Sequence, residues 1–119
     1  MEIDSSLEIN GKFPHIEQKD LSKLICEQFW YDGELKDPAN VVHLCVDNHW
    51  IRLYFDCGII FWRDQSAAPE PYSYLDKSAA KVETRLQNLL NEIGVESCLI
   101  VCVEAREISG GSMVKIALS

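Results

Sequence analysis

The sequence has few basic residues, and this scarcity limits the partners that the protein is expected to bind. It contains 11 Lys and Arg against 19 Asp and Glu, which gives a formal net charge of −8. No basic stripe is present to neutralise phosphates, so the composition argues against binding to nucleic acid or to an anionic membrane surface. The charge permits a basic protein partner, although an acidic composition often serves only solubility.

Long hydrophobic runs are also missing. No segment approaches the ~20 apolar residues of a membrane span, and the first ten residues, MEIDSSLEIN, lack the apolar run of a signal peptide. The five cysteines are odd in number and irregularly spaced, which argues against a disulfide framework. We therefore expect a cytoplasmic protein with reduced thiols, which are Cys26, Cys45, Cys57, Cys98 and Cys102.

The motifs of common enzyme families are absent. The sequence contains no HExxH, GxSxG or CxxC pattern, and Gly110-Gly111 lacks the lysine and following helix of a phosphate-binding loop. Two acids placed for acid–base chemistry cannot be identified from the sequence alone. We therefore assign no catalytic residue, no metal ligand and no cofactor, and the sequence favours a protein that is not an enzyme.

What the sequence does contain is the composition of an ordinary globular domain. Of its 119 residues, 47% are hydrophobic and 25% are charged, and a chain of this length suits one domain. No repeat or linker divides it. We expect a single α+β domain over residues 1–119, with an antiparallel sheet of about five strands and two helices packed on one face.

Residues 41–63 predict a three-stranded meander. A two-residue turn at Asn48-His49 separates polar from apolar side chains, and a slip of one position would mix the two faces. The apolar face then contains Val42, Leu44, Val46, Ile51, Leu53 and Phe55. For the second turn, a three-residue bulged loop at 56–58 pairs Arg52 with Trp62. This is preferred to the two-residue alternative, which pairs Arg52 with Arg63.

The C-terminal residues 97–118 predict a hairpin. The run CLIVCV is apolar on both faces and indicates a central strand, and residues 109–112 form the turn. Two helices are predicted elsewhere, over about 16–30 and 76–93, because apolar residues recur there at steps of three and four. Gly94 suits the position that follows the second helix, where φ is positive.

The outer, polar face of the meander is the candidate site. It carries several aromatic rings, and exposed rings that lie together often mark interfaces. The leading hypothesis is a binding face for a protein partner or a second copy of the chain, formed by Trp50, Arg52, Tyr54, Trp62, His43 and Cys45.

Two alternatives remain open for the same face. One is a small enzyme or metal-binding protein that uses His43, Cys45 and Asp47, which are residue types that bind metals. Neighbours on one strand face stand ~6.8 Å apart, however, which is too far for a direct catalytic dyad. A small-ligand pocket under the loop 64–74 is the other alternative. Cys57 is expected at an exposed hairpin tip, where Asp56 raises the pKa of its thiol and disfavours a catalytic thiolate.

Overall fold

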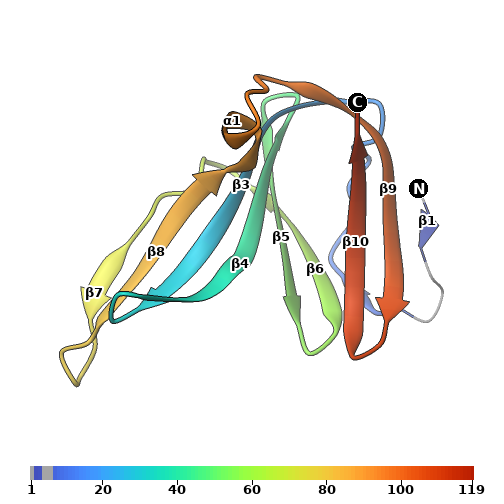
Figure 1. The fold of residues 1–119 in the computed structure, drawn as a ribbon. Coiled ribbons are helices and arrows are strands. Elements are labelled where there is room, and N and C mark those ends of the chain that lie inside the picture. The colour runs from blue at the N-terminus through green and yellow to red at the C-terminus, as the bar shows by residue number, and fades with distance from the viewer. Residues whose placement is uncertain (1, 4–6) are drawn as a thin grey trace.

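A computed structural model describes residues 2–3 and 7–119, and within these residues the protein is built almost entirely of β-strands (Figure 1). The strands form one ten-stranded sheet with the order β1-β9-β3-β4-β5-β6-β2, while β10 pairs with β9 and β8 pairs with β3 and β7. Their bounds are β1 Glu2–Ile3, β2 Ile9–Asn10, β3 Asp20–Tyr31, β4 Glu34–Val46, β5 His49–Asp56, β6 Ile59–Gln65, β7 Ser73–Leu75, β8 Lys81–Asn88, β9 Cys98–Ile108 and β10 Gly111–Leu118.

The prediction of an α+β fold with two packed helices is wrong. Residues 16–30 contain most of β3 instead of a helix. The pairing of β3 with β4 is interrupted by register shifts near Ser22 and Gln28. Because each irregularity displaces the two-residue alternation of a strand, the apolar residues of β3 recur at three and four positions and imitate a helical stripe.

The second predicted helix, over 76–93, is replaced by a turn, the strand β8 and a single helical turn, α1 (Leu89–Glu92). In β8, Val82 and Thr84 are buried on one face while Lys81 and Arg85 are exposed on the other, which is the alternation of a strand. The Asn88 side chain caps α1 by accepting a hydrogen bond from the backbone N–H of Leu90 at 3.2 Å. Gly94 follows α1 with φ +72°, as predicted.

Tight turns set the register of the meander. Asp47-Asn48 and Cys57-Gly58 are two-residue turns with positive φ at both positions, the geometry that matches the twist of paired strands. The first turn lies one residue earlier than predicted, so Leu44 faces Ile51 rather than Leu53. The pairing moves by two positions, which leaves each side chain on its predicted face.

The second turn overturns the preferred register of the other hairpin. Its two-residue loop places Arg52 opposite Arg63 and Leu53 opposite Trp62. The predicted bulged loop and the Arg52–Trp62 pair are therefore wrong. Trp62 lies on the inner face of the sheet with the apolar residues, where it is 1% exposed.

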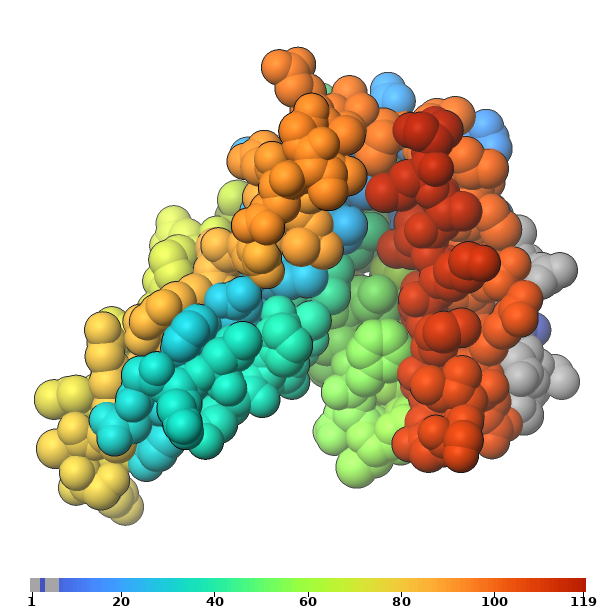
Figure 2. All heavy atoms as spheres, in the orientation of Figure 1, coloured from blue at the N-terminus to red at the C-terminus, as the bar shows by residue number. Residues whose placement is uncertain are grey.

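The sheet divides into two regions where β3 changes partner. At Asp20 and Leu21, β3 pairs with β9, whereas from Ile25 to Tyr31 it pairs with β8. We call the curled part formed by β5, β6, β9, β10 and the adjoining ends of β3 and β4 the barrel region. We call β7, β8 and residues 25–41 the flap. Figures 1 and 2 show the flap extending away from the barrel region.

The hydrophobic core lies inside the barrel region. The predicted C-terminal hairpin forms, with β9 central and Ile116 of β10 opposite the fully buried Val103, although its turn is shorter than predicted and β10 begins at Gly111. The core cluster consists of Ile16, Leu21, Leu44, Val46, Ile51, Leu53, Ile60, Trp62, Leu90, Ile100, Val103 and Ala105. Across the described ranges, no helix has the length and apolar character needed to cross a membrane.

Candidate functional site

Rings and cations alternate on the outer side of β5 and β6. Because the inward residues Ile51 and Leu53 are buried, their strand neighbours Trp50, Arg52 and Tyr54 point to the opposite side. Cross-strand pairing adds residues of β6 to this side. We define the ring–cation face as Lys23, Trp50, Arg52, Tyr54, Phe61 and Arg63.

The side chains of this face are held by contacts with one another. The Tyr54 and Phe61 rings stack with their centres 4.8 Å apart and their planes within 1°. The guanidinium carbon of Arg52 lies 5.5 Å from the Tyr54 ring centre, and that of Arg63 lies 5.5 Å from the Phe61 ring centre. Cation–π contacts at exposed sites contribute about 0.5–1 kcal/mol each, so they orient the side chains more than they stabilise the fold.

The charges of the face have no acidic counterpart within the described part of the chain. Arg52 and Arg63 stand directly opposite each other, and neither forms an ion pair with a described residue. The same holds for Lys23, whose Nζ lies 5.9 Å from the Trp50 ring centre. Like charges placed opposite on a sheet are unfavourable. The face is therefore a local concentration of positive charge on an acidic protein.

Arg63 is fixed by neutral acceptors at the edge of the face. Its Nη1 donates to the backbone carbonyls of Asn10 at 3.1 Å and Trp62 at 2.8 Å, and its Nη2 donates to the Asn10 side chain. These bonds satisfy several donors without neutralising the charge. Arg63 therefore links the ring–cation face to the segment that precedes β3.

His43 and Cys45 are not available at this surface. They are 4% and 7% exposed, although they share the outer side with Trp50 and Arg52. The chain between β6 and β7 has to cross the sheet, and in Figure 1 it passes behind β3 and β8. Alternation along a strand identifies the face on which a residue lies but not whether that face is covered, so the burial of His43 and Cys45 could not be predicted from it.

The structure also separates the three predicted metal-binding types. The Nε2 of His43 lies 3.5 Å from Oε1 of Glu27, whereas Asp47 sits in the turn and accepts a hydrogen bond from the backbone N–H of Asp20. Among residues 2–3 and 7–119, no group of three or more His, Cys, Asp and Glu side chains is placed to hold a metal ion.

Three residues of the face escaped sequence reasoning. Phe61 and Arg63 point outward only with the two-residue turn, which sequence patterning disfavours because it places two arginines opposite each other. Lys23 falls within the helix predicted over about 16–30. Trp62, in contrast, was expected outside and packs inside against Phe13, with ring centres 5.1 Å apart.

Cys57 behaves as its neighbours predict. It is exposed at the tip of the β5–β6 hairpin and is not in a disulfide. A hydrogen bond with the Asp56 carboxylate and the nearby negative charge raise the pKa of the Cys57 thiol. The prediction of an exposed thiol at the hairpin tip is confirmed, and the raised pKa agrees with the expectation that Asp56 disfavours a thiolate.

Comparison with models of known protein families, with curated proteins and with solved structures gives no match.

Proposed function

We propose that the protein is a non-enzymatic interaction module whose ring–cation face binds an acidic segment of a partner protein. The observation that carries this proposal is the set of three cations that alternate with aromatic rings and lack acidic partners among the described residues. Trp, Tyr and Arg are the residues that most often dominate the binding energy of protein interfaces. A partner carboxylate would relieve the repulsion between Arg52 and Arg63.

The charge of the face, rather than that of the whole chain, indicates the partner. A net charge of −8 permits a basic partner, but Lys23, Arg52 and Arg63 would repel one. The same charges oppose a two-fold dimer through this face, because such a dimer brings each patch against its own copy. A second copy fits only if it presents a different, acidic surface, which produces a head-to-tail contact.

A protein partner is favoured over single-stranded nucleic acid, which also binds surfaces of rings and cations. A long polyanion extends beyond the face and is repelled by the net charge of −8 on the rest of the protein. A short acidic segment interacts mainly with the positive charges next to it, because more distant charges are screened by salt. The cysteines support a cytoplasmic setting for the interaction, because all five are free thiols in the structure.

Selection from a random peptide display library tests the proposal. We expect peptides enriched in Asp and Glu next to an aromatic or aliphatic residue. The strongest peptide, made synthetically, should lose at least about tenfold in affinity for Arg52→Glu and for Trp50→Ala, because one change reverses a charge and the other removes a ring. Lys77→Glu is the matched control, since Lys77 is an exposed lysine outside the face.

Two control measurements accompany the binding experiment. Circular dichroism must show that Arg52→Glu and Trp50→Ala are folded like the wild type. An oligodeoxythymidine of the same length as the peptide is titrated in parallel. Enrichment without acidic residues, equal affinity of Arg52→Glu and the wild type for the peptide, or preferential binding of the oligonucleotide would each overturn the proposal.

A further inference from the structure

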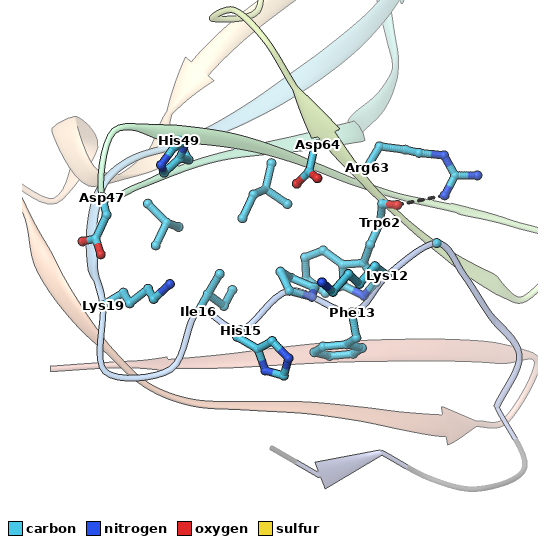
Figure 3. Close-up of a pocket in the computed structure, with 14 residues that line it drawn as sticks. Lys12, Phe13, His15, Ile16, Lys19, Asp47, His49, Trp62, Arg63 and Asp64 are labelled. Atoms are coloured by element: carbon cyan, nitrogen blue, oxygen red, sulfur yellow. Dashed lines mark hydrogen bonds between the residues drawn. The ribbon is translucent and has the colours of Figure 1, made fainter.

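A pocket of about 540 Å³ lies on the inner side of the sheet, away from the ring–cation face (Figure 3). One wall is formed by inward residues of β4, β5 and β6, and the other by residues 11–19, which we call the strap. Pockets that bind small molecules have volumes of about 300–1,000 Å³ and often lie at the mouths of curled sheets. The pocket is therefore large enough for a metabolite.

The strap is anchored at both ends, so the pocket is formed before any ligand arrives. At one end Gly11 has φ +92° and lies so close to β6 that an added Cβ would overlap the Trp62 carbonyl oxygen and the Arg63 guanidinium. At the other end the backbone N–H of Gln18 donates to the Ile100 carbonyl at 2.7 Å. A preformed site avoids the entropic cost of ordering a loop on binding.

The floor of the pocket is apolar. Val46, Ile51 and Trp62 of the sheet and Ile16 of the strap line it, and each is less than 10% exposed. The Phe13 ring packs on Trp62. An apolar group placed on this floor would be removed from water, which is favourable by roughly 25 cal/mol per Å².

The charged residues of the pocket are divided between its two walls. The strap contributes Lys12 and Lys19, the β4–β5 turn contributes Asp47, and β6 contributes Asp64 and Arg63. Figure 3 shows Asp64 across the pocket from the strap, and it shows the Arg63 side chain turned away. Opposite charges on opposite walls select a molecule that carries both signs.

The charged side chains of the pocket do not form ion pairs with one another. In the described part of the chain, Lys12, Lys19 and Asp64 form no side-chain hydrogen bond or ion pair, and Asp47 accepts only the backbone N–H of Asp20. Elsewhere the chain does use short acid–base contacts, such as Lys36 with Glu34 at 2.8 Å. Lys12, Lys19 and Asp64 therefore line the cavity with charges that no described side chain neutralises.

We propose that this pocket binds a small zwitterion with an apolar body, namely a free amino acid with an apolar side chain. Lys12 and Lys19 bind the carboxylate, Asp64 accepts hydrogen bonds from the ammonium group, and the side chain lies on the floor formed by Ile51 and Trp62. This proposal is independent of the interaction at the ring–cation face, which uses the other side of the sheet.

Calorimetric titration with L-phenylalanine and two truncated probes tests the assignment. 3-Phenylpropionate lacks the ammonium group, and phenethylamine lacks the carboxylate. We expect L-phenylalanine to bind at least about tenfold more tightly than either probe, because each truncation leaves one set of pocket charges unpaired. L-Leucine is titrated as a second apolar amino acid.

Variants then assign each group to its wall. Lys12→Gln with Lys19→Gln should abolish the preference for L-phenylalanine over phenethylamine, and Asp64→Asn should abolish its preference over 3-phenylpropionate. Lys77→Gln, which lies outside the pocket, and Arg52→Glu, on the ring–cation face, should bind L-phenylalanine like the wild type.

Three results would overturn the proposal. One is no detectable heat or indole fluorescence change with either amino acid at about 10 mM, a concentration above the Kd expected of a metabolite site. Another is equal affinity for L-phenylalanine and 3-phenylpropionate, which would indicate a simple anion site. The third is unchanged binding in the folded Lys12→Gln, Lys19→Gln double variant.

Discussion

The barrel region and the flap belong to one sheet but are stabilised in different ways. Every residue of the core cluster lies in the barrel region, in the strap or in α1, and none lies in β7, β8 or residues 25–41. The flap buries Cys26, Val82 and Thr84 separately from that cluster. Apolar burial therefore stabilises the barrel region, whereas the flap depends on contacts between neighbouring strands.

Polar and ring contacts run along the flap. The Gln28 side chain donates to Gln87 at 3.1 Å and accepts from the Trp30 indole N–H at 3.0 Å, while the Arg85 guanidinium lies 3.8 Å from the Trp30 ring centre. The Tyr31 hydroxyl donates to Asp76 at 2.7 Å. A neutral hydrogen bond or an exposed cation–π contact contributes about 1 kcal/mol, and a hydrogen bond to a carboxylate about 1.5–3 kcal/mol. Because the flap has few such contacts and no share of the core cluster, it should open without unfolding the barrel region.

The largest expected effect is in the barrel region. Leu44 is 0% exposed in the core, so Leu44→Ala should lower the free energy of unfolding by about 2–5 kcal/mol through lost burial and a cavity. Urea denaturation followed by fluorescence measures this change. Leu35→Ala, at a flap position that is 43% exposed, should change it by less than about 0.5 kcal/mol. Similar losses for the two variants would contradict the comparison.

Hydrogen exchange of the wild-type protein should distinguish the opening free energies of the barrel region and the flap. Amides of β9 beside Val103 should exchange only through global unfolding, whereas amides of β8 beside Arg85 should exchange through local opening at a lower free energy. Leu44→Ala should accelerate exchange in β9 and leave exchange in β8, which occurs through local opening, nearly unchanged. Equal protection in the wild type would show that the flap unfolds only together with the barrel.

A smaller, local effect is expected for Trp30→Ala. This change removes the ring beneath Arg85 and the donor to Gln28, and it should lower the opening free energy of the flap by about 1 kcal/mol. Trp30→Phe keeps a ring for Arg85 and should recover part of the loss. The same exchange experiment reads both variants, and an equal change at the β9 amides would refute a local role.

The smallest effect is a pH dependence at the end of the flap. The Tyr31 hydroxyl and the Ser78 hydroxyl donate to the Asp76 carboxylate and lower its pKa. A carboxyl group whose folded pKa is depressed stabilises the fold above its unfolded value, about 3.9, and this contribution is lost as pH falls through the folded pKa. Exchange at Ala80 should therefore accelerate in acid beyond its intrinsic rate, and Asp76→Asn should remove that acceleration.

Local alternation predicted part of this fold correctly. The apolar faces around Leu44 and Ile51, the C-terminal hairpin and the thiol at Cys57 follow from two-residue periodicity and turn residues. The helices failed because the irregularities of β3 produce helical spacing in a strand. The partner change of β3 depends on contacts between distant segments, and no local pattern encodes it.

The candidate site, like the fold, could be predicted from the sequence only where local alternation determines it. Trp50, Arg52 and Tyr54 share a strand face that alternation identifies directly. Trp62 was misplaced because one turn length decides which side of β6 faces the core. Lys12 of the strap and Asp64 of β6 line the same pocket, an arrangement that arises only once the strap is folded against the sheet.

The contact at Gly11 implies a sharp contrast in what an evolving sequence can tolerate. Gly33 also has a positive φ, but an added Cβ would meet nothing within 4 Å, so Asn or Asp can replace it at modest cost. At Gly11 any larger residue would collide with the β6 backbone. A random-codon library selected for folding should accept several residues at position 33 and glycine alone at position 11. The shape of the pocket therefore depends on keeping glycine at one position of its lining.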